Sequence, residues 1–307
     1  MGSVIPSVKK DTKHTLMVIA AAVVIIISVF VCINLASGVS PPQTIVDSPS
    51  MQHGKGSQLG VIDTGDMVLL KSKEKVVIRT YVDGYKTGYQ TFGGYGDVIV
   101  YERGKDPWGR DQNPVIHRAI LWLNYKEDGS WSAPSLKNYP TDLWSCRTAG
   151  GMYTSDYNTL SGEFTMKNMG YNGNLTQTID LNELAKRYPH SGYITMGDNN
   201  PRFDQPGNVS GVTGLITYEQ IRSVAWVEIP WAGAFRMLWN GGESTEKLNM
   251  YAPNTVPCLA ASIISAVFLL LGLSFLFDRI YYTKFRRELY EEVNAPTPEF
   301  PVEDENE

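Results

Sequence analysis

The chain has 307 residues, enough for one large domain or two small ones. Its formal charge of -5 is mild and argues against a nucleic-acid partner. Of its three cysteines, Cys32 and Cys258 lie in apolar runs and Cys146 stands alone, so no disulfide framework is predicted.

The first predicted element is an apolar helix over residues 16–36, which carries no charge. At 1.5 Å per residue it would be roughly 30 Å long, about the thickness of the hydrocarbon core of a bilayer. The alternative is a removable secretory signal, since Ala36-Ser37-Gly38 resembles a cleavage site. The apolar part of such signals is about 7–15 residues long, and this run exceeds it. We therefore expect an uncleaved membrane anchor.

A second uncharged run covers residues 256–277, and the flanking charges predict the orientation of both spans. Lys9, Lys10 and Lys13 precede the first span, and several Lys and Arg residues follow the second. The positive-inside rule then places residues 1–15 and 278–307 in the cytosol and residues 37–255 outside. The sequons at Asn174 and Asn208 suit an exported domain, and the acidic end from Glu299 is predicted to be disordered.

Between the spans the sequence predicts many short strands. A turn and buried strand cover residues 61–70, and further strands are expected over 76–81, 96–101, 115–125, 191–196 and 224–229. Residues 83–95 read as a loop or hairpin, residues 107–113 as a polar loop, and residues 218–222 as a short helix. The fold class expected is mostly β: a folded sheet or barrel-like ectodomain flanked by two transmembrane helices.

In residues 126–190 Trp and Tyr residues are spaced among Gly, Asn, Ser and Thr, which predicts an insertion of short strands and loops. One helix is predicted over residues 180–188, because Asp180 can cap its N-terminus and Glu183 follows three residues later. The insertion's Trp and Tyr residues could form a carbohydrate platform, contact substrate, or build a small satellite core, and the last is favoured.

An apolar stretch over residues 230–239 precedes the second span. Trp231, Phe235 and Trp239 are predicted to lie near the lipid headgroups, where Trp is enriched. Ordinary packing beneath the sheet is the alternative.

Three residue types with complementary chemistry occur in separate segments. Ser50 lies just beyond the first span, His117 lies on a predicted strand, and Asp198 and Asp204 follow another strand. A Ser hydroxyl needs a neighbouring base, and an imidazole can serve as one near neutral pH. No metal site is visible and no cofactor is expected, because no His or Cys pair has ligand spacing.

The motifs together resemble type I signal peptidase. They are Ser48-Pro49-Ser50-Met51, Gly65-Asp66, Gly96-Asp97-Val98-Ile99-Val100-Tyr101, Val115-Ile116-His117-Arg118 and Gly197-Asp198-Asn199-Asn200. His117, in place of the Lys of typical bacterial enzymes, is typical of the archaeal and endoplasmic-reticulum branch. The chain departs from the family at Pro49, at Gln52-His53 and in its long insertion.

The resemblance implies a role for each matching residue. Ser50 would be the nucleophile and His117 the general base, with Asp204 orienting the imidazole. Asp198 would more often support its turn through backbone N–H groups. The resemblance implies the Ser48 hydroxyl as an oxyanion donor beside the Ser50 N–H, although Ser48 and both Asp could be plain turn residues. Met51 is expected to contact the bilayer surface.

The function expected is a membrane-bound serine endopeptidase that removes signal peptides from exported preproteins. Its expected partners are preproteins, the lipid bilayer and the protein translocation channel. An archaeal-type plasma membrane is favoured over the endoplasmic reticulum. Two alternatives remain: a non-catalytic membrane-anchored β domain that binds exported chains, and a processing enzyme with narrow substrates.

Overall fold

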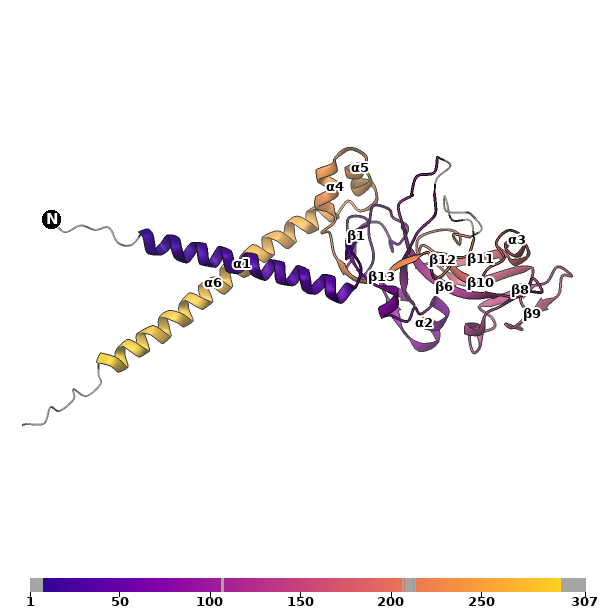
Figure 1. Ribbon diagram of the computed structural model, residues 1–307, viewed down its shortest axis with the longest axis horizontal. Helices are drawn as coiled ribbons and strands as arrows, with labels where there is room; N and C mark the ends of the chain where they lie inside the picture. Colours follow the sequence, from indigo (N-terminus) through magenta and orange to yellow (C-terminus); the bar gives the residue numbers. More distant parts are fainter. Residues whose placement is uncertain (1–7, 106–107, 206, 208–211, 213, 294–307) are drawn as a thin grey trace, which may run out of the picture. The chain divides into compact units, whose positions relative to one another are not determined.

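The computed structural model describes residues 8–105, 108–205, 207, 212 and 214–293. It divides into two compact units, residues 1–256 and residues 257–307. The described chain is of mixed α and β class with antiparallel sheets (Figure 1). The mostly β prediction was therefore too narrow, because helices α2 (Tyr81–Thr87), α3 (Leu181–Arg187), α4 (Ala234–Asn240) and α5 (Gly242–Tyr251) accompany the strands.

Both predicted apolar runs are helical. They lie in α1 (Val8–Ser37) and α6 (Thr255–Val293), and the segments Ile19–Ser37 and Thr255–Lys284 are long and apolar enough to cross a membrane. Gly38 ends α1 in the left-handed conformation, with φ of 71°, and its N–H donates to Asn34 O at 2.9 Å.

The main sheet has the strand order β1-β2-β13-β5-β6-β12, and β7 pairs with β6 outside this path. Every pairing in it is antiparallel. Its strands are β1 (Gln43–Ile45), β2 (Met67–Lys71), β13 (Ile221–Ile229), β5 (Val98–Tyr101), β6 (Val115–Tyr125), β12 (Gly192–Met196) and β7 (Trp131–Ser132). The β-branched and aromatic residues of β5 are all buried, which explains why its strand signal is so strong.

The register of the sheet gathers particular residues on one face. His117 on β6 lies opposite Ile99 on β5, and Val115 lies opposite Tyr101. Ala119, two residues beyond His117, lies opposite Thr195 on β12. Because side chains alternate along a strand, His117, Tyr101 and Thr195 point to the same face of three adjacent strands, whereas Arg118 points to the other.

The predicted insertion forms a second sheet of order β11-β10-β8-β9. Its strands are β8 (Trp144–Arg147), β9 (Tyr153–Thr154), β10 (Glu163–Met169) and β11 (Leu175–Asp180). Asp180 caps α3, accepting hydrogen bonds from the backbone N–H groups of Asn182 and Glu183, as predicted.

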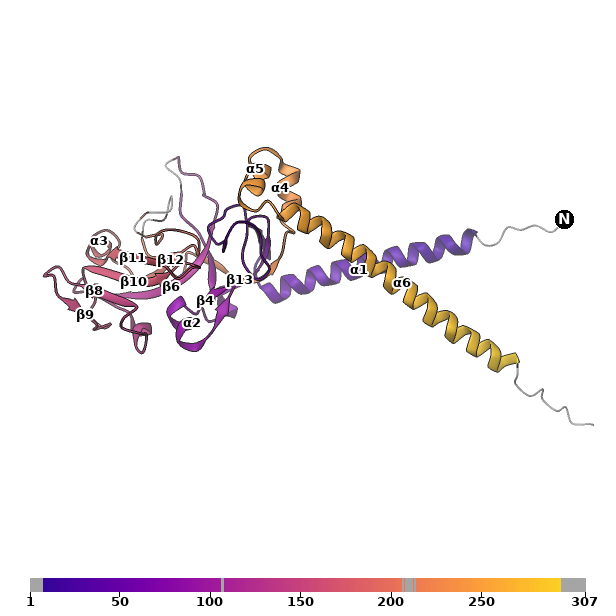
Figure 2. The same cartoon turned by 180° about the vertical axis from the view of Figure 1, so that it is seen from behind.

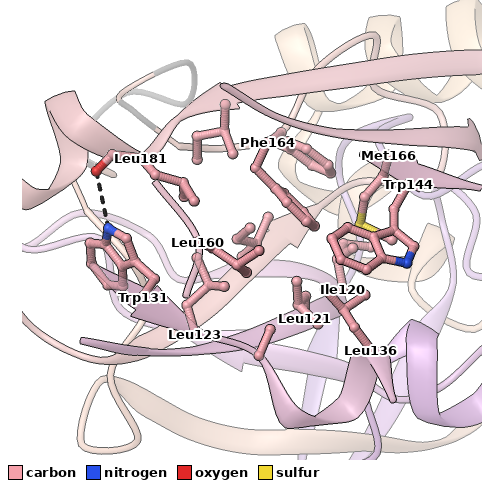
Figure 3. Packing of buried hydrophobic residues seen from close by; sticks show 14 of the residues in the cluster. Ile120, Leu121, Leu123, Trp131, Leu136, Trp144, Leu160, Phe164, Met166 and Leu181 are labelled. Carbon is pink, nitrogen blue, oxygen red and sulfur yellow. Dashed lines mark hydrogen bonds between the residues drawn. The ribbon is translucent and has the colours of Figure 1, made fainter. Parts of the chain in front are cut away.

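Most of the insertion's aromatic residues build a core rather than a surface platform. Trp131, Trp144 and Phe164 pack with Leu121 and Leu123 of β6 (Figure 3). The buried indole N–H of Trp131 donates to Leu181 O at 3.0 Å. The predicted satellite core is therefore continuous with the main sheet, which ties the insertion to the strand that carries His117.

Several local predictions were wrong. Residues 76–80 form no strand, because the backbone of Arg79 bonds instead to Asp97 and Thr80 caps α2. Residues 218–220 form a turn and β13 begins at Ile221, so no helix forms there. Of the loop or hairpin expected over residues 83–95, residues 83–87 belong instead to helix α2, and the hairpin follows as β3 (Gln90–Thr91) and β4 (Gly94–Tyr95).

Two short 3-10 helices, Lys73–Lys75 and Pro134–Leu136, complete the list of elements. Four predictions rest wholly or partly on residues outside the described ones: the cytosolic tail at residues 1–15, the loop at 107–113, the sequon at Asn208 and the acidic end from Glu299. Figure 2 shows the chain from behind, with β6 and β12 again side by side.

Candidate active site

The centre of the candidate site is a pair formed by His117 and Asp204. The imidazole Nδ1 lies 2.8 Å from Asp204 Oδ2, and both side chains are buried. An ionised carboxylate can only accept, so Nδ1–H is the donor. This tautomer leaves Nε2 as the free acceptor of the ring, and Nε2 bonds to no other described residue. The pair has the arrangement that a histidine general base requires.

Two hydroxyls hold the Asp204 carboxylate in place. Tyr101 OH and Thr195 Oγ1 each donate to Oδ2 at 2.7 Å. The backbone of Asp204 is also fixed, because its N–H donates to Thr195 O at 2.9 Å. These donors come from β5 and β12, whose register with β6 places them beside His117. The site is therefore built from the face that the three strands share.

The electrostatics keep Asp204 ionised. Burial alone would raise its pKa, but His117, Thr195 and Tyr101 stabilise the charged form, and the net pKa lies below the usual value. Burial and the neighbouring Asp204 raise the pKa of Tyr101 well above its usual value, so the phenol stays a donor. A carboxylate that remains charged can stabilise an imidazolium on His117.

The two serines lie on a tight turn that follows β1. Ser48 Oγ and Ser50 Oγ are 3.2 Å apart. The carbonyl of Ser50 accepts from the N–H of Asn199 at 2.9 Å, and Asn199 Nδ2 donates to Pro49 O at 3.0 Å. The Ser50 N–H donates to no described acceptor. The turn is thus fastened to the loop that also carries Asp204, with one backbone donor left open.

Ser48, Ser50 and His117 line one cavity of about 420 Å³. Its walls include two strand segments with a free edge among the described strands. β1 pairs with β2 alone, and residues 115–117 of β6 pair with β5 alone, because β12 begins its pairing at Arg118. Such edges can each take up an extended peptide through main-chain hydrogen bonds.

Ser50 and His117 are not hydrogen-bonded to each other in the described structure. The bond of Ser50 Oγ goes to Ser48 Oγ instead. Transfer of the Ser50 proton to Nε2 therefore requires the hydroxyl to turn from Ser48 toward the ring. Catalytic hydrogen bonds are often long or misaligned before substrate binds.

Asp198 lies away from this pair. Its carboxylate accepts from Arg118 Nε at 2.7 Å and from Nη2 at 2.5 Å, and its Oδ2 lies 3.0 Å from His53 Nε2. Burial would raise its pKa, but Arg118 outweighs this effect and the net pKa is lowered. The expectation of backbone N–H partners is wrong for the side chain. Asp198 also makes no hydrogen bond to His117, because it binds Arg118, whose side chain points to the opposite face of β6. This arrangement gives no support to a direct catalytic role for Asp198.

The predicted bilayer contacts divide into exposed and buried residues. Trp239 is 91% exposed and Phe235 is 58% exposed, both on α4. Trp231 is half-buried, and its indole N–H donates to Ser57 Oγ at 2.9 Å. Met51 is only 1% exposed and packs with Val46 and other apolar residues, so its predicted surface contact is wrong.

Lys247 also lines the cavity and is a rival base. Its ammonium lies 2.9 Å from Glu243 Oε1, and this hydrogen bond raises the pKa of Lys247 above its usual value. A lysine that is held protonated cannot accept a proton from serine. His117 is the better candidate.

Sequence reasoning missed Tyr101, Thr195 and His53. Tyr101 ends a strong strand and Thr195 lies two residues before Gly197, but their roles depend on register, which sequence does not show. His53 pairs with Asp198 and its ring stacks on Tyr171, with centroids 5.2 Å apart. Among the described residues no group of three or more His, Cys, Asp or Glu side chains could hold a metal ion.

The chain was compared with protein-family models, with curated proteins and with solved structures, and no significant match was found.

Proposed function

We propose that the protein is a membrane-bound serine endopeptidase that removes N-terminal signal peptides from exported preproteins. The observation that carries the proposal is the His117–Asp204 pair, which opens on a cavity shared with Ser48 and Ser50. The free edges of β1 and β6 border this cavity and suit an extended polypeptide. Two unpaired strand edges beside one cavity can bind an extended peptide but offer nothing specific to a small molecule. The geometry therefore favours a peptide substrate.

The chemistry follows from these groups. Ser50 Oγ attacks the peptide carbonyl carbon while its proton passes to His117 Nε2. The oxyanion receives hydrogen bonds from the Ser50 N–H and the Ser48 hydroxyl. The imidazolium, stabilised by Asp204, returns the proton to the leaving amine as the C–N bond breaks. Water then attacks the acyl carbon and gives a proton to His117 and its oxygen to the new carboxylate. The bond to Ser50 Oγ breaks, and His117 returns the proton to this oxygen.

The membrane setting rests on the two apolar helices. We infer that α1 and α6 cross a plasma membrane and leave the catalytic unit outside, close to where signal sequences emerge. The exposed Phe235 and Trp239 of α4 suit the headgroup region. The translocation channel would deliver the substrate to the same surface.

The test uses full-length protein in lipid–detergent micelles with a preprotein. We expect cleavage by the wild type after a small residue, and loss of cleavage by about 10³-fold or more in Ser50→Ala and His117→Ala. Equal activity in all three proteins would overturn the proposal.

A second candidate is a non-catalytic domain that binds exported chains. The Ser48–Ser50 contact favours it, because the Ser50 hydroxyl bonds to Ser48 and not to His117. Binding of preprotein by the wild type without cleavage in any lipid mixture would support this candidate. Cleavage of only a few preproteins would indicate a narrow processing enzyme instead.

A further inference from the structure

A groove beside the catalytic cavity takes no part in the chemistry above. It consists of two adjoining hollows of about 260 and 240 Å³, which share Gly170, Tyr171, Asn172 and Asp198. We call it the turn groove, because the turn joining β10 to β11 forms one wall. Asn200 lines both the turn groove and the catalytic cavity. The loop that follows β12 therefore borders both spaces.

The turn groove is fixed to the nucleophile's loop. The N–H of Tyr171 donates to Asp198 O at 2.9 Å, and the N–H of Asn199 donates to Ser50 O at 2.9 Å. The ring of His53 stacks on Tyr171 at 5.2 Å with an interplanar angle of 12°. The insertion thus reaches Ser50 through two consecutive backbone contacts and has a defined position beside the site.

The lining of the turn groove mixes hydrogen-bonding and apolar groups and suits an uncharged polypeptide segment. Six amide side chains line it together with three tyrosines and several apolar residues, and glycines leave the backbone accessible: Gln90, Asn168, Asn172, Asn174, Asn199 and Asn200 supply the amides. At its base the charge of Arg118 is balanced by Asp198 at hydrogen-bond distance. Amides and exposed backbone can donate to and accept from successive peptide groups of an extended chain.

We propose that the turn groove binds the first residues of the mature part of the preprotein, beyond the bond that is cut. This inference rests on the proposed function. An extended chain leaving the catalytic cavity past Asn200 would enter the turn groove directly. The apolar signal sequence on the other side of the bond belongs in lipid, which leaves the polar mature segment for the groove. The insertion is then a substrate-binding module.

The test replaces Asn172, which is exposed and lines both hollows, with Trp to fill the groove. Asn158→Trp is the matched control, because Asn158 is exposed in the same insertion and lies outside the groove lining. Two substrates share one signal peptide but differ downstream. One continues for about eight residues, roughly 26 Å when extended, and the other for about two.

We expect Asn172→Trp to lower the ratio of kcat/KM for the long substrate over the short one by about tenfold, and Asn158→Trp to leave this ratio unchanged. An unchanged ratio in Asn172→Trp would overturn the inference. An equal fall for both substrates would do the same, because it indicates damage to the catalytic cavity.

A binding assay separates this inference from the proposed function. A fluorescent peptide with the sequence of the mature segment is titrated into full-length Ser50→Ala protein, with and without Asn172→Trp. Weaker binding by about tenfold in the double variant supports the turn groove even if the wild type cleaves nothing. Equal binding, or binding of chitotriose in place of the peptide, overturns it.

Discussion

Asp204 and Asp198 lie six positions apart, yet their side chains serve opposite faces of β6. Asp204 accepts on one oxygen from His117, Tyr101 and Thr195. Asp198 neutralises the buried guanidinium of Arg118. His117 and Arg118 are neighbours on β6, and neighbouring residues of a strand point to opposite faces. The carboxylates that bind them are therefore held on opposite faces of the strand.

This separation gives the first prediction. Asp204→Asn should lower kcat by about 10⁴-fold with little change in KM, because the amide favours the wrong imidazole tautomer. Asp198→Asn should mainly lower the melting temperature, since it leaves the Arg118 charge buried and unpaired. Steady-state kinetics and thermal unfolding on both variants check this. A larger loss of kcat in folded Asp198→Asn than in Asp204→Asn would contradict it.

Ser48 has its hydroxyl 3.2 Å from the hydroxyl of Ser50. If Ser48 donates to the oxyanion, Ser48→Ala should lower kcat by about 10²–10³-fold, while Ser48→Thr should retain more activity because its hydroxyl remains. Single-turnover cleavage rates are the measurement. Activity in Ser48→Ala equal to that of the wild type would show that Ser48 is a plain turn residue.

At the scale of elements, α3 shows how a short helix depends on its cap. Asp180 Oδ1 accepts from the N–H groups of Asn182 at 2.8 Å and Glu183 at 3.2 Å. These bonds satisfy backbone donors that a helix of this length otherwise leaves free. Leu181 and Leu184 of α3 are buried in the core that joins the insertion to β6.

Asp180→Ala should therefore reduce the free energy of unfolding by about 1 kcal/mol. Glu127→Ala is the control, because Glu127 is an exposed carboxylate near the start of the insertion without a described hydrogen bond. Thermal unfolding of full-length protein gives both values. If both variants lost the same free energy of unfolding, the loss would reflect removal of a negative charge rather than removal of the helix cap.

At the scale of the whole molecule, the loop before β2 and strand β13 together carry three carboxylates with raised pKa values, of which Asp63 and Asp66 are buried and Glu228 is half-buried. Burial raises the pKa of Asp63 to about 6 and that of Asp66 to about 7. Burial, the larger cause, and repulsion from Asp66, the smaller one, raise the pKa of Glu228 to about 7. Asp66 Oδ1 accepts from the Trp231 N–H at 2.8 Å, so the group links the loop before β2 to the segment after β13.

The fourth prediction concerns pH. Between about pH 4 and pH 7 the folded chain holds more protons on these carboxylates than the unfolded chain does. Stability from this source is complete below about pH 4 and falls as the pH rises toward 7. The melting temperature should follow this trend, and Glu228→Gln should flatten it. A melting temperature that rises equally in both proteins over this range would contradict the prediction.

Local signals in the sequence were sufficient for several elements. The apolar runs within α1 and α6, the strand β6 and the cap at Asp180 follow from hydrophobic length, β-branched composition and the spacing of polar residues. These features depend on neighbours in the chain, so periodicity and capping chemistry are enough to predict them. Ser50, His117 and Asp204 could be named as candidates because the motifs that carry them resemble type I signal peptidase.

Only the tertiary structure decided which residues meet. The register between β5, β6 and β12 brings His117 to Asp204, the partner that the resemblance implied, and adds Tyr101 and Thr195, which the sequence did not indicate. Burial of Met51 and the turn groove likewise arise from segments distant in the chain. A one-residue change of register would move every side chain to the opposite face, and a single sequence does not encode that choice in any local pattern.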